Sequence, residues 1–345
     1  MKRRSIIAST LLFALSLSVT VGCSNPASEP KVPKTPGLGA VKMGYSAWTG
    51  WAPWQVTQTK DLFQTNKVDV DLQWYTEAPK GVELFNTGKL DGNNQTLPEI
   101  IAGIANGSDP VVVLTTDNST GADKIIVSDK IKSIRDLKGK KVAAELGSVD
   151  HFLLAQSLKK AGMTFKDIQF VPLETRKAVA AFAEGKVEAV AAYTPFTTAA
   201  LKRQGSKELF SSSNFPGSIS DHLVFNRKFV NAHPEKVQAV VDSWFETLAY
   251  INTKQNRDEV NEIMAKRLGT NVTEYKDSLD GLKMFGVEDN IEAFGSGNDN
   301  TYLSNTAADM SKFLLENGMI KTKVDTSKIF DDRFVKAYAA KKQAR

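Results

Sequence analysis

The chain has 345 residues, of which 41% are hydrophobic and 24% charged, and this balance excludes a wholly disordered chain, a collagen and a coiled coil. The formal net charge of +5 is unevenly placed, because Lys2, Arg3 and Arg4 supply three positive charges and the first 22 residues contain no Asp or Glu. Cys23 is the single cysteine, which excludes a disulfide scaffold and a cysteine-ligated zinc or iron–sulfur site.

The first residues have the pattern of an export signal. The basic start precedes the one long apolar run, Ser5–Val21, which is at the short limit for crossing a bilayer. Gly22 and Cys23 follow this run and resemble the cleavage site of a bacterial lipoprotein; the alternative is an ordinary signal peptide with an incidental cysteine. We predict a lipoprotein signal peptide over residues 1–22, a lipid on Cys23 and a flexible tether over residues 23–39. The lipid would hold an exported protein on the outer face of the cytoplasmic membrane.

Residues 40–123 alternate predicted strands with predicted helices. The strands are Val41–Tyr45, the strictly alternating run Val68–Trp74 and the apolar run Pro110–Leu114, and the helices are Trp54–Phe63, Lys80–Thr87 and Leu97–Asn106. Gly88 and Gly107 end two of these helices. This alternation predicts α/β layers around a mainly parallel sheet.

A second block of the same kind covers residues 124–223. Its strands are Ile125–Val127, the end of the segment Ile134–Ala144, Phe170–Pro172 and Val187–Tyr193, and its helices are Val149–Ala161, Ala178–Ala183 and Phe196–Arg203. From residue 224 the chain returns to the first block, with the strand Val224–Phe225 and the helices Pro234–Tyr250, Arg257–Leu268, Glu274–Leu282 and Thr301–Asn317. We therefore predict one lobe from residues 40–123 and 224–345 and a second lobe from residues 124–223.

Five short segments carry a resemblance to a known family. They are Tyr45–Trp48, Lys60–Phe63, Gly88–Asp91, Ser133–Val142 and Thr194–Phe196. The phrase Asp136–Val142 is the most specific match. Over residues 41–317 the chain resembles the substrate-binding proteins of ABC importers for nitrate, sulfonates, taurine and bicarbonate. The resemblance implies a two-lobed, type II periplasmic-binding-protein-like fold, in which each lobe is a mainly parallel sheet flanked by helices and two crossover strands join the lobes. It also implies a monomer without a cofactor, which passes a small molecule held between the lobes to a permease and its ATPase.

Five further segments resemble one branch of that family, once called urea-carboxylase-related, which is associated with guanidine uptake. They are Ser46–Trp54, Asp117–Gly121, Glu145–Leu153, Tyr193–Thr198 and Asp221–Val224. The resemblance implies that guanidinium is the ligand. Neighbouring branches carry nitrate, sulfonates and thiamine precursors. The alternative ligand is therefore a small anion, such as taurine, an alkylsulfonate or nitrate, or a thiamine-precursor pyrimidine.

The loops that follow the predicted strands favour a cation without reference to the resemblance. Ligands of open α/β sheets bind beyond the carboxyl ends of strands, and five loops lie there: Ser46–Trp54, Asn93–Thr96, Thr116–Asp123, Glu145–Asp150 and Tyr193–Pro195. These loops hold aromatic and acidic residues but no Lys or Arg. Aromatic faces attract cations, and a carboxylate accepts two N–H groups of a guanidinium side by side. The predicted ligand-binding residues are Trp48, Trp51, Gln95, Asp117, Asn118, Glu145, Ser148 and Tyr193.

Several of these predicted contacts have a purely structural alternative. Trp51 suits the buried face of the first helix, and Asp117 and Asn118 are common in turns. Glu145 and Ser148 suit the start of the helix that follows them.

The remaining polar residues and the absence of catalytic motifs favour a binding protein over an enzyme. We expect His151 and His222 to be structural and Asp221 to be a further candidate for the cleft. The chain has three histidines and lacks a nucleophile elbow, a metal-binding His pair and a phosphate-binding loop, so we expect no enzymatic activity and no metal. No basic stripe indicates nucleic acid. A sensor that passes its ligand to a membrane kinase would have the same fold and is the other rival function.

Overall fold

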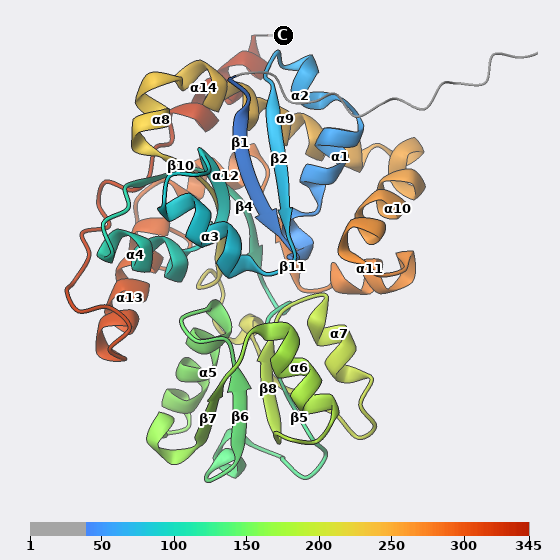
Figure 1. Ribbon diagram of the computed structural model, residues 1–345, viewed down its shortest axis with the longest axis vertical. Helices are drawn as coiled ribbons and strands as arrows, with labels where there is room; N and C mark the ends of the chain where they lie inside the picture. Colours follow the sequence, from blue (N-terminus) through green and yellow to red (C-terminus); the bar gives the residue numbers. More distant parts are fainter. Residues whose placement is uncertain (1–38, 345) are drawn as a thin grey trace, which may run out of the picture. The chain divides into compact units, whose positions relative to one another are not determined.

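The computed structural model describes residues 39–344, whose strands form two sheets (Figure 1). The first sheet contains, in spatial order, β11 (Leu282–Met284), β4 (Pro110–Ser119), β10 (Ser220–Asn226), β3 (Gly92–Thr96), β1 (Val41–Ser46) and β2 (Val70–Tyr75). The second sheet contains β7 (Gln169–Pro172), β6 (Lys141–Ala144), β8 (Ala189–Ala192), β5 (Lys124–Val127) and β9 (Lys207–Ser211). The predicted signal peptide and Cys23 lie outside the described residues.

Both sheets are mixed, whereas the sequence predicts mainly parallel ones. β1 lies parallel to β2 and β3, and β6 lies parallel to β7 and β8, as expected. β10 is antiparallel to β3 and β4, and β5 is antiparallel to β8 and β9. The chain enters β5 and β10 directly from the other sheet, through residues 120–123 and 212–219. A parallel neighbour needs a long crossover, usually an α-helix, and these two short connections contain none.

Sheet membership changes between β4 and β5 and again between β9 and β10. The first change coincides with the boundary predicted after residue 123. The second change comes before the boundary predicted after residue 223, because Ser220 already pairs with Asn118 in the first sheet. The described residues lie within one compact unit, so the division into two lobes remains a proposal.

Helices cover both faces of the first sheet. α1 (Pro53–Thr59), α2 (Leu62–Thr65), α9 (Pro234–Asn252) and α14 (Arg333–Gln343) lie on one face, and α3 (Ala78–Asn86), α4 (Leu97–Ala105) and α13 (Leu303–Glu316) lie on the other. Val111 and Val113 of β4 belong to the core on the α9 side, and Val112 between them belongs to the core on the α4 side. Side chains alternate between the faces of a strand, so a strand covered on both faces is apolar throughout.

The second sheet is also covered on both faces. α5 (Val149–Lys160) lies on one face, and α6 (Thr175–Ala183) and α7 (Phe196–Leu201) lie on the other. Ile125 and Val127 of β5 belong to the core on the α5 side, whereas Ile126 belongs to the core on the α6 side. The core on the α5 side is continuous with the core on the α4 side of the first sheet.

The remaining elements complete the fold, and two predicted helices differ from the observed ones. They are α8 (Arg227–Ala232), α10 (Arg257–Leu268), α11 (Val272–Ser278), α12 (Val287–Ala293) and the 3-10 turns η1 (Thr49–Trp51), η2 (Ile134–Leu137), η3 (Phe165–Asp167), η4 (Ser212–Asn214) and η5 (Lys254–Asn256). The helix predicted over Trp54–Phe63 is broken between α1 and α2, because Asp61 adopts a left-handed φ of 54°. The helix predicted over Glu274–Leu282 ends at Ser278, and Leu282 begins β11.

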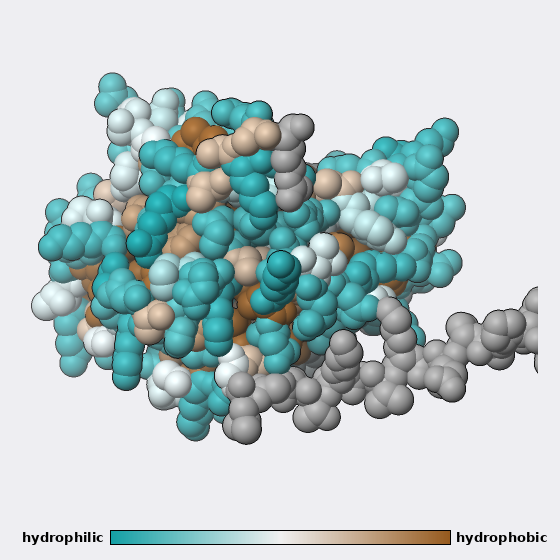
Figure 2. Space-filling model, turned by 90° about the horizontal axis from the view of Figure 1, so that it is seen from above, coloured by the Kyte–Doolittle hydropathy of each residue, from teal (hydrophilic) through white to brown (hydrophobic). Residues whose placement is uncertain are grey.

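The face of the molecule in Figure 2 is mostly hydrophilic, with apolar residues in small areas between polar ones. Among residues 39–344, Leu146 is the most exposed of the large apolar side chains, at 62%. Within residues 39–344, no helix combines the length and the apolar character that crossing a membrane requires.

Candidate ligand-binding site

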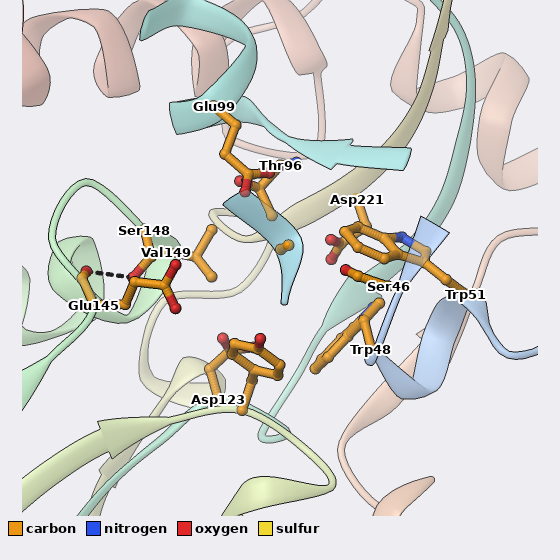
Figure 3. A pocket seen from close by; sticks show the side chains of 12 residues that line it. Ser46, Trp48, Trp51, Thr96, Glu99, Asp123, Glu145, Ser148, Val149 and Asp221 are labelled. Carbon is orange, nitrogen blue, oxygen red and sulfur yellow. Dashed lines mark hydrogen bonds between the residues drawn. The ribbon is translucent and has the colours of Figure 1, made fainter. Parts of the chain in front are cut away.

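One cavity is lined by elements of both sheets, and we call it the acidic cavity. Its lining residues are Ser46, Trp48, Trp51, Ala78, Thr96, Glu99, Asp123, Glu145, Ser148, Val149, Tyr193 and Asp221 (Figure 3). Ser46 and Thr96 end β1 and β3, and Glu145 and Tyr193 directly follow β6 and β8. The cavity therefore lies where the carboxyl ends of parallel strands meet, as predicted for an α/β fold. About 40 Å³ of it is open to the centres of water-sized spheres.

The structure brings five of the eight predicted ligand-binding residues to this cavity: Trp48, Trp51, Glu145, Ser148 and Tyr193. Gln95, Asp117 and Asn118 do not line it. Gln95 is fully buried in β3, and neither atom of its amide group has a hydrogen-bond partner. Asp117 lies behind Trp48. Asn118 lines a different cavity beside Lys283, because successive residues of a strand point to opposite faces.

An aromatic wall forms one side of the acidic cavity. The rings of Trp48 and Tyr193 meet edge to face, with centroids 5.7 Å apart and planes at 76°. The indole N–H of Trp48 donates to Oδ1 of Asp117 at 2.9 Å, which fixes the orientation of the ring. Trp51 also lines the cavity, and its indole N–H has no hydrogen-bond partner.

Gly50 allows the turn that carries these two tryptophans. A Cβ atom at this position would lie 2.3 Å from Oδ2 of Asp117 and 2.5 Å from Nε1 of Trp48. Real Cβ atoms do not approach other atoms so closely, so the backbone between Trp48 and Trp51 needs a glycine here. Trp54, three residues further on, is instead a core residue stacked on Phe63.

Within the part of the chain that the structure describes, four carboxyl groups surround the cavity and no Lys or Arg side chain lines it. Figure 3 shows Glu99, Asp123, Glu145 and Asp221 at separate points around the space. Oε2 of Glu145 accepts hydrogen bonds from the backbone N–H and the hydroxyl of Thr175, at 3.1 and 2.9 Å. Glu145 therefore supports the start of α6 rather than the start of the helix that follows it in sequence. Neither carboxylate oxygen of Asp123 has a hydrogen-bond partner.

Burial raises the pKa of these carboxyl groups. It raises the pKa of Glu99 to about 7 and that of Asp123 to about 6. The pKa of Glu145 is also raised by burial, against the opposing effect of its hydrogen bonds from Thr175. Burial and the neighbouring acidic groups raise the pKa of Asp221 well above its usual value. Perturbed acids that line a cavity are typical of a functional site.

A second layer of acidic groups lies behind the lining. Burial raises the pKa of Asp117 to about 7, although its hydrogen bonds from Thr116 and Trp48 oppose the change. Asp150, in the first turn of α5, is fully buried, and neither of its carboxylate oxygens has a hydrogen-bond partner. Burial and the charges of Asp123 and Glu145 raise the pKa of Asp150 well above its usual value.

Ser148 and the two buried histidines have structural contacts. The Ser148 hydroxyl oxygen accepts from the backbone N–H of His151 at 3.3 Å, so Ser148 caps α5 while it lines the cavity. The His151 ring stacks on Phe170 with centroids 4.8 Å apart, and burial lowers its pKa to about 4. Burial lowers the pKa of His222 to about 3. Both rings are therefore neutral at pH 7, as expected of structural histidines.

The sequence prediction named Asp221 only as a further candidate for the cleft, and it omitted Glu99 and Thr96 from its set of ligand-binding residues; all three line the acidic cavity. Oε2 of Glu99 accepts from the backbone N–H and the hydroxyl of Thr96, at 2.8 and 2.9 Å. The spacing Thr-x-x-Glu ahead of an apolar run is the sequence signal that could have placed Glu99 at the start of α4. The position of Asp221 at the cavity follows from the register of β10 against β3 and β4, which no local sequence pattern predicts.

Comparison with known proteins identifies the family. The sequence profile of the NMT1-like family matches residues 34–265, about two thirds of the chain. The chain belongs to the NMT1-like family. This NMT1-like chain is 29% identical over 271 residues to a provisionally named aliphatic sulfonates-binding protein of Escherichia coli, and the alignment covers 77% of this chain and 80% of the other.

Two solved structures have the fold of this NMT1-like protein. The periplasmic aliphatic sulphonate binding protein SsuA from Escherichia coli matches with a TM-score of 0.72 at 24% identity, over 86% of this chain and 93% of the other. The periplasmic nitrate-binding protein NrtA from Synechocystis PCC 6803 also matches with a TM-score of 0.72, at 14% identity, over 90% and 91%. These matches confirm the predicted two-sheet, periplasmic-binding-protein-like fold.

Proposed function

We propose that this protein is an extracytoplasmic solute-binding protein of an ABC importer. It would bind a small molecule in the acidic cavity and deliver it to a permease and its ATPase. The family membership supports this proposal, as do the fold shared with periplasmic binding proteins and the cavity lined by both sheets. The relatives compared above are named for binding rather than for a reaction, which favours transport over catalysis. Export and a lipid on Cys23 remain part of the proposal.

The names of the relatives and the side chains of the cavity indicate opposite charges for the ligand. The names of the relatives refer to sulfonates and nitrate, so the comparisons favour a small anion over guanidine. The lining supports the opposite charge, because four carboxyl groups and no Lys or Arg face the cavity. A buried carboxylate needs a positive partner or a proton. On this one observation we propose a small monovalent cation, with guanidinium as the specific candidate. A small anion held by protonated carboxyl groups is the second candidate.

Backbone donors at the cavity also favour a cation. Anions often bind to the free N–H groups at the start of a helix. Here the first N–H of α6 donates to Glu145, and the backbone N–H of His151 in α5 donates to Ser148. These two donors are therefore already used by side chains of the lining. An anion that bound the N–H of Thr175 would have to displace the Glu145 carboxylate.

The cavity is small, since only about 40 Å³ is open to the centres of water-sized spheres. Guanidinium, urea and nitrate have four heavy atoms each, and we propose a ligand of this size.

The lining residues match the faces and edges of a planar cation. The ring of Trp48 would contact one face of the guanidinium plane, where a cation–π contact contributes roughly 0.5–2 kcal/mol, and Tyr193, whose ring lies at 76° to it, would contact the ligand edge. Glu145 and Glu99 each use Oε2 for a neighbouring threonine, which leaves Oε1 for the N–H edge of the ligand. Asp123 would accept from another edge with its two unpaired oxygens.

Calorimetric titration of the ligand-free protein with guanidinium, urea, nitrate and taurine at matched ionic strength tests the proposal. We expect binding of guanidinium, and binding of urea at least tenfold weaker at pH 7.5 because urea carries no charge. At 100 times its dissociation constant, guanidinium should raise stability by about 2.7 kcal/mol, or Tm by about 4 °C for a chain of this size. Tight binding of nitrate or taurine without heat from guanidinium would establish the anion instead.

Two matched variants connect the binding to the cavity. Glu145→Gln removes one lining charge and should weaken guanidinium binding at least tenfold, which is about 1.4 kcal/mol. Glu262→Gln makes the same change on the exposed side of α10 and should leave the affinity unaltered. Equal affinities for both variants would place the binding site outside the acidic cavity.

A further inference from the structure

Asp117 and Asp221 are buried carboxyl groups on neighbouring strands. They face each other in the antiparallel register of β4 and β10, with exposures of 0% and 3%. This register places the two side chains on the same face of the sheet, and a hydrogen bond between them contributes to the pKa of both groups. Two carboxylates are both acceptors, so a hydrogen bond between them requires a proton on one of them. Asp221 lines the acidic cavity, and Asp117 lies behind it, against Trp48.

The groups around this pair offer hydrogen bonds but no positive charge. The indole N–H of Trp48 and the hydroxyl of Thr116 donate to the two oxygens of Asp117, at 2.9 and 2.8 Å. Two other elements bring acidic groups toward the pair, namely Glu99 on α4 and Asp123 in the connection to β5. Each of these neighbours makes a second negative charge on the pair more costly.

The basic side chains nearest in sequence do not neutralise the pair. His222 follows Asp221 in β10, but its ring nitrogens contact hydroxyl groups of β4 and β10 at 3.1 Å. Burial lowers the pKa of His222 to about 3, so the ring is neutral. Lys124, beside the acidic connection, forms an ion pair with Glu208. The pair therefore has only protons, or a bound cation, to balance its charge.

We propose that the Asp117–Asp221 pair exchanges a proton for the ligand: entry of one monovalent cation expels one proton from the pair, while a second proton stays between the two carboxyl groups. The inference rests on the proposed function, because it requires a cationic ligand. In the ligand-free protein at mildly acidic pH, both carboxyl groups hold a proton. On binding, one O–H bond breaks and its proton leaves to solvent. The single negative charge that remains on the pair balances the positive charge of the cation.

This exchange makes affinity for the cation depend on pH in one direction. The anionic form of the pair binds the cation, and raising the pH populates that form before the ligand arrives. Affinity should therefore rise with pH, by up to tenfold per pH unit while a whole proton is released, and then level off. Urea needs no compensating charge, so its weaker binding should not rise with pH.

Calorimetry counts the proton directly. Guanidinium chloride is titrated into the full processed protein at pH 6.0 in phosphate and in a second buffer with a larger enthalpy of ionisation. The difference in heat gives the number of protons released, and we expect between 0.5 and 1 per guanidinium, falling toward zero at pH 8.5. Asp117→Asn places a fixed N–H donor where the shared proton lies, and should at least halve the release at pH 6.0. Asp258→Asn removes an exposed carboxyl on α10 and should leave the release as in the parent.

The possible results separate this inference from the function on which it rests. Absence of guanidinium binding at every pH would overturn both. Binding with no proton release from the parent protein would overturn the exchange alone, even if the Asp117→Asn protein does not fold. If a folded Asp117→Asn protein releases as many protons as the parent, the proton comes from another acid. That result would also overturn the proposed role of the Asp117–Asp221 pair. Release that falls in this variant and persists in the Asp258→Asn control supports it.

Discussion

We predict that the buried carboxyl group of Asp123 contributes to ligand binding at a cost to the stability of the ligand-free protein. Its side chain is 1% exposed, and neither carboxylate oxygen has a hydrogen-bond partner. Asp150, which is likewise unpaired, and Asp117 lie close enough to interact electrostatically with it. We predict that Asp123→Asn makes the ligand-free protein more stable at pH 7.5 and weakens its binding of guanidinium.

The size of the effect follows from the pKa of this carboxyl. Burial raises the pKa of Asp123 from 3.8 to about 6, and each pKa unit corresponds to about 1.4 kcal/mol. Above pH 6 the ionised group therefore lowers the free energy of unfolding by about 3 kcal/mol, and below pH 4 this penalty falls to less than about 1 kcal/mol. A buried amide and a buried protonated carboxyl are both neutral polar groups, so their burial costs are similar and largely cancel. The net gain of the variant is therefore about 3 kcal/mol at pH 7.5, and it largely disappears at pH 4.0.

Urea unfolding of the ligand-free protein, followed by tryptophan fluorescence, measures this difference. The parent, Asp123→Asn and the exposed control Asp258→Asn are compared at pH 7.5 and pH 4.0. Only the Asp123→Asn protein should have a higher midpoint than the parent at pH 7.5, and that advantage should be lost at pH 4.0. An Asp123→Asn protein that is less stable at pH 7.5, or equally favoured at both pH values, would refute the reasoning.

Three further predictions address the cavity wall, the turn behind it and the anchor. Trp48→Phe removes the indole donor to Asp117 and part of the ring face, so calorimetry should record guanidinium affinity at least fivefold lower; parental affinity would exclude Trp48 as a contact. Gly50→Ala forces a Cβ against Asp117 and should lower stability by about 1–3 kcal/mol in urea unfolding, and a parental midpoint would contradict the tight turn. Cys23→Ser should release the exported protein from membranes or block its processing, and fractionation identical to the parent would exclude lipidation.

Chain order and strand position were enough to predict part of the cavity. The carboxyl ends of parallel strands lie at one edge of a sheet, so the residues after β6 and β8 had to approach one another. β1 belongs to the other sheet, and the meeting of the two edges was expected from the resemblance to binding proteins. Trp48, Glu145 and Tyr193 follow those strands and line the acidic cavity, whereas Glu99 and Asp221 come from a helix and a strand.

The antiparallel strands were the part that local pattern could not predict. Asp117 and Asn118 adjoin in sequence, but one lies behind the acidic cavity and the other lines a different one. Which of the two faces inward depends on the register of β10 against β4, which contains two irregularities. Glu99 was missed for another reason: it lies on α4 rather than in a loop after a strand, and only its contact with Thr96 brings it to the cavity.

The fold of this protein and the charge of the ligand that it prefers depend on different features of the chain. The fold decides that loops from both sheets converge on one small space, and relatives named for sulfonates and nitrate share that fold. The sign is decided by side chains, because the same helix starts bind an anion when their N–H groups are free and favour a cation when carboxylates occupy them. In this chain Glu145 takes the N–H of Thr175 at the start of α6, and Asp221 lies across the cavity without a basic partner. We therefore propose that the carboxyl groups of this lining, rather than the shared fold, set the charge of the ligand.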